Sequence, residues 1–197
     1  MKKIGITGGI GTGKSTFLKV LQKLGFKTFS CDEIIKTFYQ DPEIKEKVAQ
    51  ILGEEVLNPK GEIDKKLISK KILENRSLKE KLESFFHPLV KEELDKFLKK
   101  VADLKERIVF VEVPLLFEVG WDKFFDEVWV ISCSPEVQLK RLLERGLSLE
   151  IAKSFIQAQL PLAEKEKRAN RVFSSEDPPE KWEIELKEIL KEYRIHK

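Results

Sequence analysis

Short apolar runs alternate with amphipathic stretches along this chain. The runs Ile108–Val113 and Glu127–Ser132 are almost continuously apolar, as is typical of central parallel strands that are covered on both faces. Three shorter runs, Lys3–Thr7, Phe26–Cys31 and Arg171–Ser174, have the composition of further strands. Helical patterns separate these runs, so the sequence predicts an α/β fold, with a five-stranded parallel sheet between helices in a three-layer core.

Between the second and the third of these runs, the pattern is almost entirely helical. Proline directly after Asp41 predicts one helix start, and Ser77-Leu78-Lys79-Glu80 has the form of a capping box that opens another. We expect His87-Pro88 to end that helix, since proline disfavours a helical residue before it. A stretch of about 75 residues is too long for a simple crossover. We therefore expect a helical insertion over residues 33–106, which either binds a substrate or is a purely structural cap.

A glycine-rich stretch follows the first apolar run directly. Residues 8–15 read Gly-Gly-Ile-Gly-Thr-Gly-Lys-Ser and match G-x-x-x-x-G-K-[S/T] at every fixed position. A helical pattern comes next, and a glycine loop between a strand and a helix can bind a nucleoside triphosphate through backbone N–H groups and the helix N-terminus. We expect Lys14 to reach the β- and γ-phosphates and Ser15 to ligate Mg²⁺. The residues expected to bind the nucleotide are Gly8, Gly9, Gly11, Thr12, Gly13, Lys14, Ser15 and Thr16.

The composition narrows the class of partner. Lys and Arg number 37 against 34 Asp and Glu, a net charge of +3, which gives none of the basic footprint of a nucleic-acid binder. No apolar run approaches the length that spans a membrane, and the first strand starts too early for a signal peptide, so we expect a cytoplasmic protein without a membrane partner. Cys31 and Cys133 end strands that are not neighbours, so we expect two buried thiols and no disulfide.

Phosphate-loop proteins fall broadly into switches, motors and small kinases. The sequence contains neither D-x-x-G nor N-K-x-D, which switch GTPases use, and Glu112 is its only candidate for the strand-end acid of a motor. A small-molecule kinase needs a base, an insertion that holds the acceptor, and a cationic lid. Asp32 is the candidate base, because the loops after two parallel strands emerge at the same edge of the sheet.

The lid is expected within about residues 141–168. Its candidate cations are Arg141, Arg145, Lys153, Lys165 and Arg168. For each of them taken singly, a solvated helical face is the alternative. A kinase of another small hydroxyl compound, such as a nucleoside or a shikimate-like acceptor, and a nucleotide-dependent regulatory protein are the alternative functions.

Five stretches carry a more specific resemblance. In chain order they are Thr7–Ser15, Cys31–Ile35, Phe86–Val90, Val113–Glu118 and Gln159–Lys165. Together they resemble the dephospho-coenzyme A kinase family over nearly the whole chain. The resemblance implies transfer of the γ-phosphate of ATP, with Mg²⁺, to the ribose 3′-hydroxyl of the small molecule dephospho-CoA. It also implies a kinase core of residues 1–32 and 107–197, with the lid inside it and a helical CoA-binding insertion at 33–106.

The resemblance implies roles for individual residues as well. The catalytic residues would be Lys14, Asp32 and Arg141, and the substrate-binding residues Thr7, Asp32, His87, Leu115 and Glu118. For His87, the cap of a helix C-terminus is an equal alternative, since a histidine also suits the negative end of the helix dipole.

The chain departs from the family in two places. The family usually has Ala-Asp-x-Val-Ile-Asp-Asn where this chain has Ala-Asn-Arg-Val-Phe-Ser-Ser, so Asn170, Ser174 and Ser175 replace acidic and amide residues. Gly146 stands where an acidic residue commonly follows the arginine. Two exposed serine hydroxyls beside the adenine would fix a donor–acceptor pattern only weakly. We therefore expect ATP to be preferred over GTP by only about tenfold.

Overall fold

The computed structural model describes residues 1–195, with side chains described up to Lys191. The chain divides into two compact units. The sheet unit consists of Met1–Phe29 and Val101–Lys197, and the helical unit consists of Ser30–Lys100.

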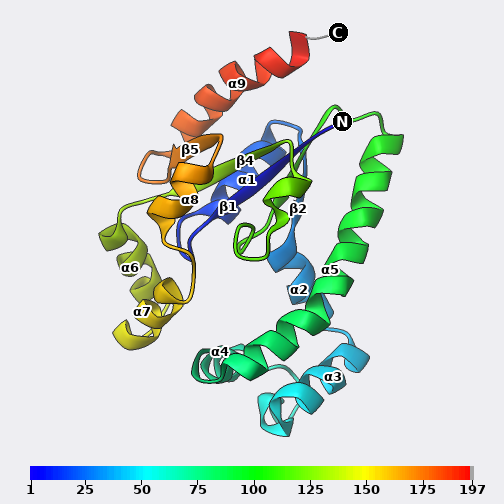
Figure 1. Ribbon diagram of the computed structural model, residues 1–197, viewed down its shortest axis with the longest axis vertical. Helices are drawn as coiled ribbons and strands as arrows, with labels where there is room; N and C mark the ends of the chain where they lie inside the picture. The colour runs from blue at the N-terminus through cyan, green and yellow to red at the C-terminus, as the bar shows by residue number, and fades with distance from the viewer. Residues whose placement is uncertain (196–197) are drawn as a thin grey trace. The chain divides into compact units, whose positions relative to one another are not determined.

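The sheet unit is built on a sheet of five strands among the described residues (Figure 1). They are β1 (Lys2–Gly8), β2 (Lys27–Ser30), β3 (Ile108–Glu112), β4 (Glu127–Ser132) and β5 (Arg171–Ser174). Their order across the sheet is β2-β3-β1-β4-β5. β1 pairs in parallel with β3 on one side and with β4 on the other, and β4 pairs in parallel with β5. The predicted α/β fold is confirmed, and the carboxyl end of β1 lies between those of β3 and β4.

Helices α1 (Lys14–Lys23) and α9 (Pro179–Ile195) cover one face of this sheet. The ring of Phe17 in α1 lies 4.8 Å from that of Phe173 in β5 and 5.2 Å from that of Trp182 in α9, between centroids. The buried residues around them include Ile4, Ile6, Leu21, Phe110, Trp129, Ile131 and Leu186. Burial of each large apolar side chain is worth about 1.5–3 kcal/mol, so this layer holds α1, and with it the glycine-rich loop, against the sheet.

The chain between β4 and β5 forms α6 (Pro135–Glu144), α7 (Leu149–Gln157) and α8 (Leu162–Arg168). The hydroxyl of Ser134 accepts a hydrogen bond from the N–H of Val137 at 3.4 Å, and that of Ser148 accepts one from Ile151 at 3.3 Å. Both serines are therefore N-caps, a position for which serine is one of the preferred residues. α6 packs against α7 (Figure 1), and α8 packs against β4. A short 3₁₀ helix, η2 (Trp121–Phe124), precedes β4.

The helical unit has a core of its own. Its elements are α2 (Cys31–Phe38), α3 (Pro42–Leu52), the 3₁₀ helix η1 (Glu54–Val56), α4 (Lys65–Glu74) and most of α5 (Arg76–Asp103). The buried side chains that pack together are Val48, Ala49, Leu52, Val56, Ile68, Leu82 and Phe86. The predicted start of α3 is confirmed, since Asp41 caps the N–H groups of Glu43 and Ile44 at 2.8 and 3.2 Å.

The predictions for α5 are wrong at two points. The helix starts one residue before Ser77, and Asn75 caps it by accepting a hydrogen bond from the N–H of Leu78 at 3.2 Å. Pro88 lies inside the helix and does not end it. Proline removes one backbone hydrogen bond, but Phe86 and Val90 are buried on either side of it, and this packing overrides the local preference. His87 is therefore not a C-cap.

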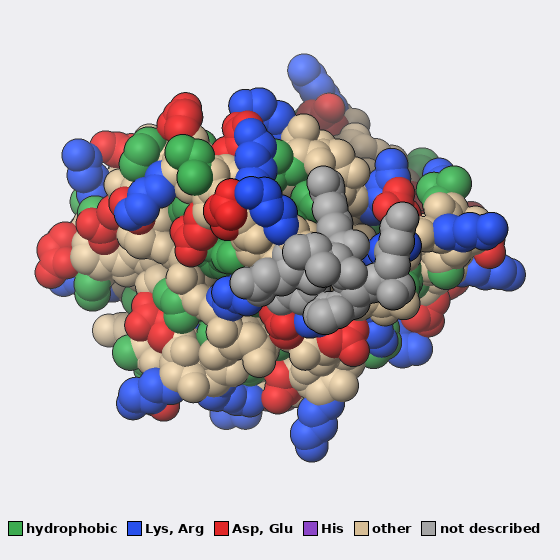
Figure 2. Space-filling view, turned by 90° about the horizontal axis from the view of Figure 1, so that it is seen from above, with side chains coloured by type: hydrophobic (Ala, Val, Ile, Leu, Met, Phe, Trp, Pro, Cys, Tyr) green, Lys and Arg blue, Asp and Glu red, His purple; other side chains and the backbone are tan. Residues whose placement is uncertain are grey.

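The surface and the thiols complete the description of the fold. No helix among the described residues is both long and apolar enough to cross a membrane. Figure 2 shows acidic and basic side chains interspersed over one face, with no segregated field of one sign. Cys31 and Cys133 are buried and form no disulfide, as expected. Burial raises the pKa of the Cys133 thiol, against the opposing effect of the nearby Arg141 guanidinium.

Candidate active site

Two glycines let the loop between β1 and α1 take its conformation. A Cβ on Gly8 would lie 2.3 Å from the carbonyl oxygen of Ile131 in the neighbouring strand. Gly13 has φ 98°, which a side chain would strain, and it precedes the first turn of α1. Among the described residues, no side chain caps α1 and no acidic residue stands in its first turn. The N-terminal N–H groups of α1 can therefore receive an anion.

The side chain of Lys14 folds back over this loop. Its side chain is buried, and its ammonium donates a hydrogen bond to the carbonyl oxygen of Gly9 at 2.9 Å. The hydroxyl of Thr12 donates to the same oxygen at 2.9 Å. Ser15 and Thr16, in contrast, are exposed. The loop is thus held by its own side chains, and its hydroxyl-bearing end is accessible from solvent.

Arg141 of α6 flanks the loop. Its guanidinium donates to the hydroxyl of Ser175 at 2.7 Å, to the carbonyl oxygen of Ser175 at 2.6 Å and to that of Gly11 at 3.4 Å. Ser175 is therefore not the exposed residue that we expected. Its N–H donates to the carbonyl oxygen of Ser132 at 2.8 Å, which extends the β4–β5 pairing by one residue and turns the side chain inward. Ser174 is exposed.

Lys165 of α8 lies at the ends of β1 and β3. Its side chain is 0% exposed, although the pattern of charges suggested a lid cation or a solvated face. The ammonium contacts the carbonyl oxygens of Gly8 and Pro114 at 3.1 and 3.0 Å and a carboxylate oxygen of Glu118 at 2.9 Å. The hydroxyl of Thr7 also donates to Pro114, at 3.1 Å. Burial lowers the pKa of Lys165, the charge of Glu118 opposes that effect, and the charge of Lys14 adds to it.

Two glutamines that the site prediction did not include hold the middle of the loop. The side-chain amide of Gln138 donates to the carbonyl oxygen of Ile10 at 2.7 Å, and the N–H of Ile10 donates to the amide oxygen of Gln159 at 2.9 Å. Gln159 stands in one of the stretches that carry the family resemblance. Gln138 has a weaker signal in the sequence: it precedes Arg141 by three positions, which places both on one helix face.

Both departures from the family pattern have a local explanation. Asn170 takes part in two hydrogen bonds with the backbone of Val128, one through its side-chain oxygen and one through its N–H, each 2.8 Å long. It thus joins the start of β5 to β4. Gly146 has φ 84° and follows the C-cap residue Arg145, so it ends α6 in the left-handed conformation that glycine takes most easily.

The other predicted site residues are distributed over both units. Asp32 and His87 are exposed in the helical unit, Asp32 in the first turn of α2 and His87 in α5. Arg145 and Lys153 are exposed near α7, and Leu115 is half-buried in the loop after β3. The guanidinium of Arg168 lies 4.3 Å above the ring of Phe117 and pairs with Asp122 at 3.5 Å. The structure therefore brings together Thr7, Gly8–Ser15, Glu118, Arg141 and Lys165.

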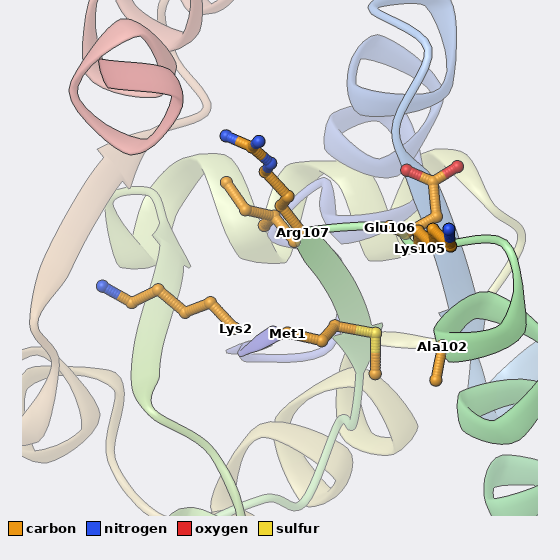
Figure 3. A pocket seen from close by; sticks show the side chains of 7 residues that line it. Met1, Lys2, Ala102, Lys105, Glu106 and Arg107 are labelled. Atoms are coloured by element: carbon orange, nitrogen blue, oxygen red, sulfur yellow. The ribbon is translucent and has the colours of Figure 1, made fainter. Parts of the chain in front are cut away.

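A cavity of about 730 Å³ opens at the opposite edge of the sheet (Figure 3). Lys2 and Ile108, the first residues of β1 and β3, line it together with residues 102 and 105–107. Open parallel sheets bind their ligands at the carboxyl ends of the strands, and this cavity is at the amino ends. The glycine-rich loop remains the candidate site.

Comparison with known proteins agrees with this geometry. Residues 2–178 match the family model for dephospho-CoA kinase. The dephospho-CoA kinase of Fusobacterium nucleatum is 37% identical over 174 residues, which are 87% of this chain and 88% of that protein. The crystal structure of TT1252 from Thermus thermophilus matches with a TM-score of 0.79 at 30% identity and covers 97% of both chains. The dephospho-CoA kinase from Campylobacter jejuni matches with a TM-score of 0.67 at 30% identity over 98% and 97% of the two chains.

Proposed function

The chain belongs to the dephospho-CoA kinase family, and from that premise we propose that its glycine-rich loop transfers the γ-phosphoryl group of ATP to the ribose 3′-hydroxyl of dephospho-CoA, giving coenzyme A and ADP. The observation that carries the proposal is the loop itself, with Lys14 beside it and the uncapped N-terminus of α1 behind it. Phosphoryl transfer depends mainly on positioning and on stabilisation of charge, and this loop offers both.

Lys14 and Arg141 supply the positive charge in this proposal. The ammonium of Lys14 exchanges the carbonyl oxygen of Gly9 for oxygens of the β- and γ-phosphates. Arg141 is already fixed beside Gly11 and Ser175, so little side-chain entropy is lost when it stabilises the transferred group. The remaining phosphate contacts come from backbone N–H groups of residues 11–16, since the N–H of Ile10 already donates to Gln159.

We propose that Mg²⁺ accompanies the nucleotide, with Ser15 as the ligand that the protein contributes. Among the described residues, no group of three or more His, Cys, Asp and Glu side chains could hold a metal ion. That fits an ion that keeps several waters and takes most of its other ligands from phosphate oxygens. When bound, it would neutralise charge that develops between the β- and γ-phosphates.

The helical unit binds the acceptor in this proposal, as an insertion over residues 33–106. Asp32 stands at its start, on the second residue beyond β2, and its carboxylate is exposed. It accepts the proton of the 3′-hydroxyl as a general base. His87, Thr7, Leu115 and Glu118 bind the same substrate, and a merely structural cap is the alternative for the helical unit.

The moving part of the lid is α7 with the residues next to it. Arg145 and Lys153 are exposed there, whereas Arg141 and Lys165 are already tied to the phosphate loop. Closure of such a segment excludes water and brings its cations to the phosphates. We place the enzyme in the cytoplasm, where cysteines outside disulfides, such as Cys31 and Cys133, stay reduced, with a small molecule as its partner.

The deciding experiment follows ADP release from Mg·ATP with a panel of acceptors. Release that depends on dephospho-CoA, together with phosphate on the 3′-oxygen of the product, supports the proposal. Release that depends on a nucleoside or on shikimate instead would move the enzyme to another small kinase. Slow hydrolysis that no acceptor accelerates would indicate a regulatory protein. The Lys14→Ala variant serves as the control for contaminating kinases.

A further inference from the structure

The side chain of Lys165 is fully buried, and its ammonium contacts three oxygen atoms. A lysine ammonium has three donor positions, and Lys165 has three acceptors: the carbonyl oxygens of Gly8 and Pro114 and the carboxylate of Glu118. A buried charge is costly unless it is paired and hydrogen-bonded. Lys167, two positions further along α8, shows the contrast, because its side chain is 70% exposed and its ammonium pairs with Glu164 at the surface.

Two of these acceptors lie where β1 and β3 separate. Among the described residues, their backbone pairing ends with the hydrogen bond from the N–H of Val113 to the carbonyl oxygen of Ile6, at 2.9 Å, and the hydroxyl of Thr7 then donates to Pro114 at 3.1 Å. Beyond it, one chain enters the phosphate loop at Gly8 and the other enters residues 114–118, which we call the acceptor loop. Lys165 contacts a carbonyl oxygen of each. It therefore continues the connection between the two chains after their backbone pairing has ended.

The segment just before α8 repeats this double contact. Gln159 accepts a hydrogen bond from Ile10 in the phosphate loop, and the N–H of Leu160 donates to Glu118 of the acceptor loop at 2.9 Å. Residues 159–165 thus touch both loops at both of their ends. A salt bridge that served stability alone would need only the contact between Lys165 and Glu118.

We propose that Lys165 is a positioning residue, which sets the distance between the acceptor loop and the phosphate loop so that the acceptor hydroxyl meets the γ-phosphate in line. The proposal rests on the proposed function, because it gives the acceptor loop a role in holding the substrate. Misplacement of reacting groups by about 1 Å can cost about a hundredfold in rate. A contact that fixes the two loops relative to each other therefore matters for turnover, beyond its effect on stability.

The first test is Lys165→Met, assayed with Lys167→Met as the matched control. We expect kcat to fall by about ten- to a hundredfold, with the KM for dephospho-CoA raised. The KM for ATP should change by less than about threefold, because the contacts of Lys14 and Thr12 with Gly9 do not involve Lys165. The control should keep wild-type kinetics. Assays run well below the unfolding temperature of each variant, so that a loss of stability alone leaves kcat unchanged and overturns the proposal.

A double variant separates positioning from charge pairing. Removal of Lys165 leaves Glu118 as an unpaired carboxylate, and Glu118→Gln removes that cost. We expect Lys165→Met/Glu118→Gln to regain thermal stability but to keep a kcat at least about tenfold below that of Glu118→Gln alone. Equal kcat values in the double variant and the Glu118→Gln variant would show that Lys165 only neutralises Glu118, and the proposal would be wrong.

Hydrogen exchange tests the proposal without any substrate. In the ligand-free protein, amides of residues 115–120 should exchange at least about tenfold faster in Lys165→Met than in the wild type, and no faster in Lys167→Met. Unchanged exchange overturns the proposal even if dephospho-CoA proves not to be the acceptor. An inactive wild type with the expected exchange would instead refute only the proposed function. If Lys165→Met does not fold, Lys165→Gln, whose amide still donates hydrogen bonds, is judged by the same criteria.

Discussion

Arg141 donates two hydrogen bonds to Ser175, from one guanidinium nitrogen to the hydroxyl at 2.7 Å and from the other to the carbonyl oxygen at 2.6 Å. This pair joins α6 to the residue after β5, directly beside the phosphate loop at Gly11. The hydroxyl of Ser175 is therefore already hydrogen-bonded within the protein. The hydroxyl of Ser174 is engaged as well, as the acceptor of a 3.2 Å hydrogen bond from the N–H of Glu176.

Base choice should therefore depend on backbone groups. With both hydroxyls engaged inside the loop, we expect ATP to be preferred over GTP by about tenfold, or about 1.4 kcal/mol. The measurement is kcat/KM for each nucleotide at saturating dephospho-CoA. Ser174→Ala should leave the ratio within about twofold. A preference of about a thousandfold would contradict this account and show that buried polar groups read the base.

Lys14→Ala should reduce turnover by about a hundredfold or more, because it removes a charge that is aimed at the transferred group. Lys19→Ala, an exposed position on the same helix, is the matched control and should keep full activity. Steady-state ADP release measures both variants. Near-normal turnover of a folded Lys14→Ala protein would reject the assignment of the phosphate loop.

Asp32→Asn should lower kcat strongly while ATP binding changes little. The asparagine keeps the shape of the side chain but cannot accept the hydroxyl proton. Glu33→Gln removes the adjacent exposed carboxylate and should have little effect. Titration with a non-hydrolysable ATP analogue gives the affinity, and single-turnover assays give the rate. Lost ATP affinity with normal turnover would identify Asp32 as a ligand of the nucleotide or its metal.

Dephospho-CoA should protect the helical unit from hydrogen exchange. If residues 33–106 hold the acceptor, amides across them should slow on addition of dephospho-CoA and respond much less to an ATP analogue. The comparison uses one protein and two ligands, so differences in intrinsic exchange cancel. Equal protection by both ligands would favour a purely structural role for this unit.

Tyr39 should make stability sensitive to alkaline pH. Burial raises its pKa to about 12, and its ring packs edge-on against Phe86, 5.4 Å between centroids. In the unfolded chain, the hydroxyl of Tyr39 has the ordinary tyrosine pKa of about 10. Neutral Tyr39 therefore contributes its full share to the free energy of unfolding below about pH 10. As the pH rises towards 12, this contribution falls by on the order of 2 kcal/mol.

Denaturant unfolding at about pH 9 and about pH 11 checks this for the wild type and for Tyr39→Phe. The phenylalanine variant should lose less stability between the two pH values. Because the chain has only two tyrosines, a difference titration of tyrosinate absorbance between the two proteins isolates Tyr39. A midpoint near 10 in the folded protein would contradict the raised pKa.

Local chemistry explains which elements were predictable from the sequence. Asp41 caps α3 with its own carboxylate, and the glycine loop carries its conformation in its residue types, so neither needs knowledge of distant contacts. Pro88 is different, since only the burial of Phe86 and Val90 shows that α5 continues through it. For the same reason Ser175 was expected to be exposed, although its inward turn depends on Ser132 of another strand.

The residues of the candidate site also differ in whether local sequence or distant contacts determine their environment. The residues of the phosphate loop are adjacent in the sequence and could be identified directly. Lys165 had the appearance of one more cation in a charged segment, because its burial follows from α8 packing on β4 and from oxygen atoms contributed by Gly8, Pro114 and Glu118. Nothing near it in the chain shows those three partners. The roles of Asp32 and His87 stay predictions.

The strand order β3-β1-β4-β5 also bears on how the enzyme can be re-engineered. The phosphate loop leaves the central strand, the acceptor loop leaves the strand on one side, and the segment Ser174–Asp177 leaves the second strand on the other side. Nucleotide preference and acceptor preference would then be separate modules that share only the loop between them. Libraries that vary residues 176 and 177 and keep Ser175 can search for a new base without disturbing the contacts of Arg141 and Lys165, and residues 115–117 of the acceptor loop can vary while Pro114 and Glu118 keep their contacts with Lys165.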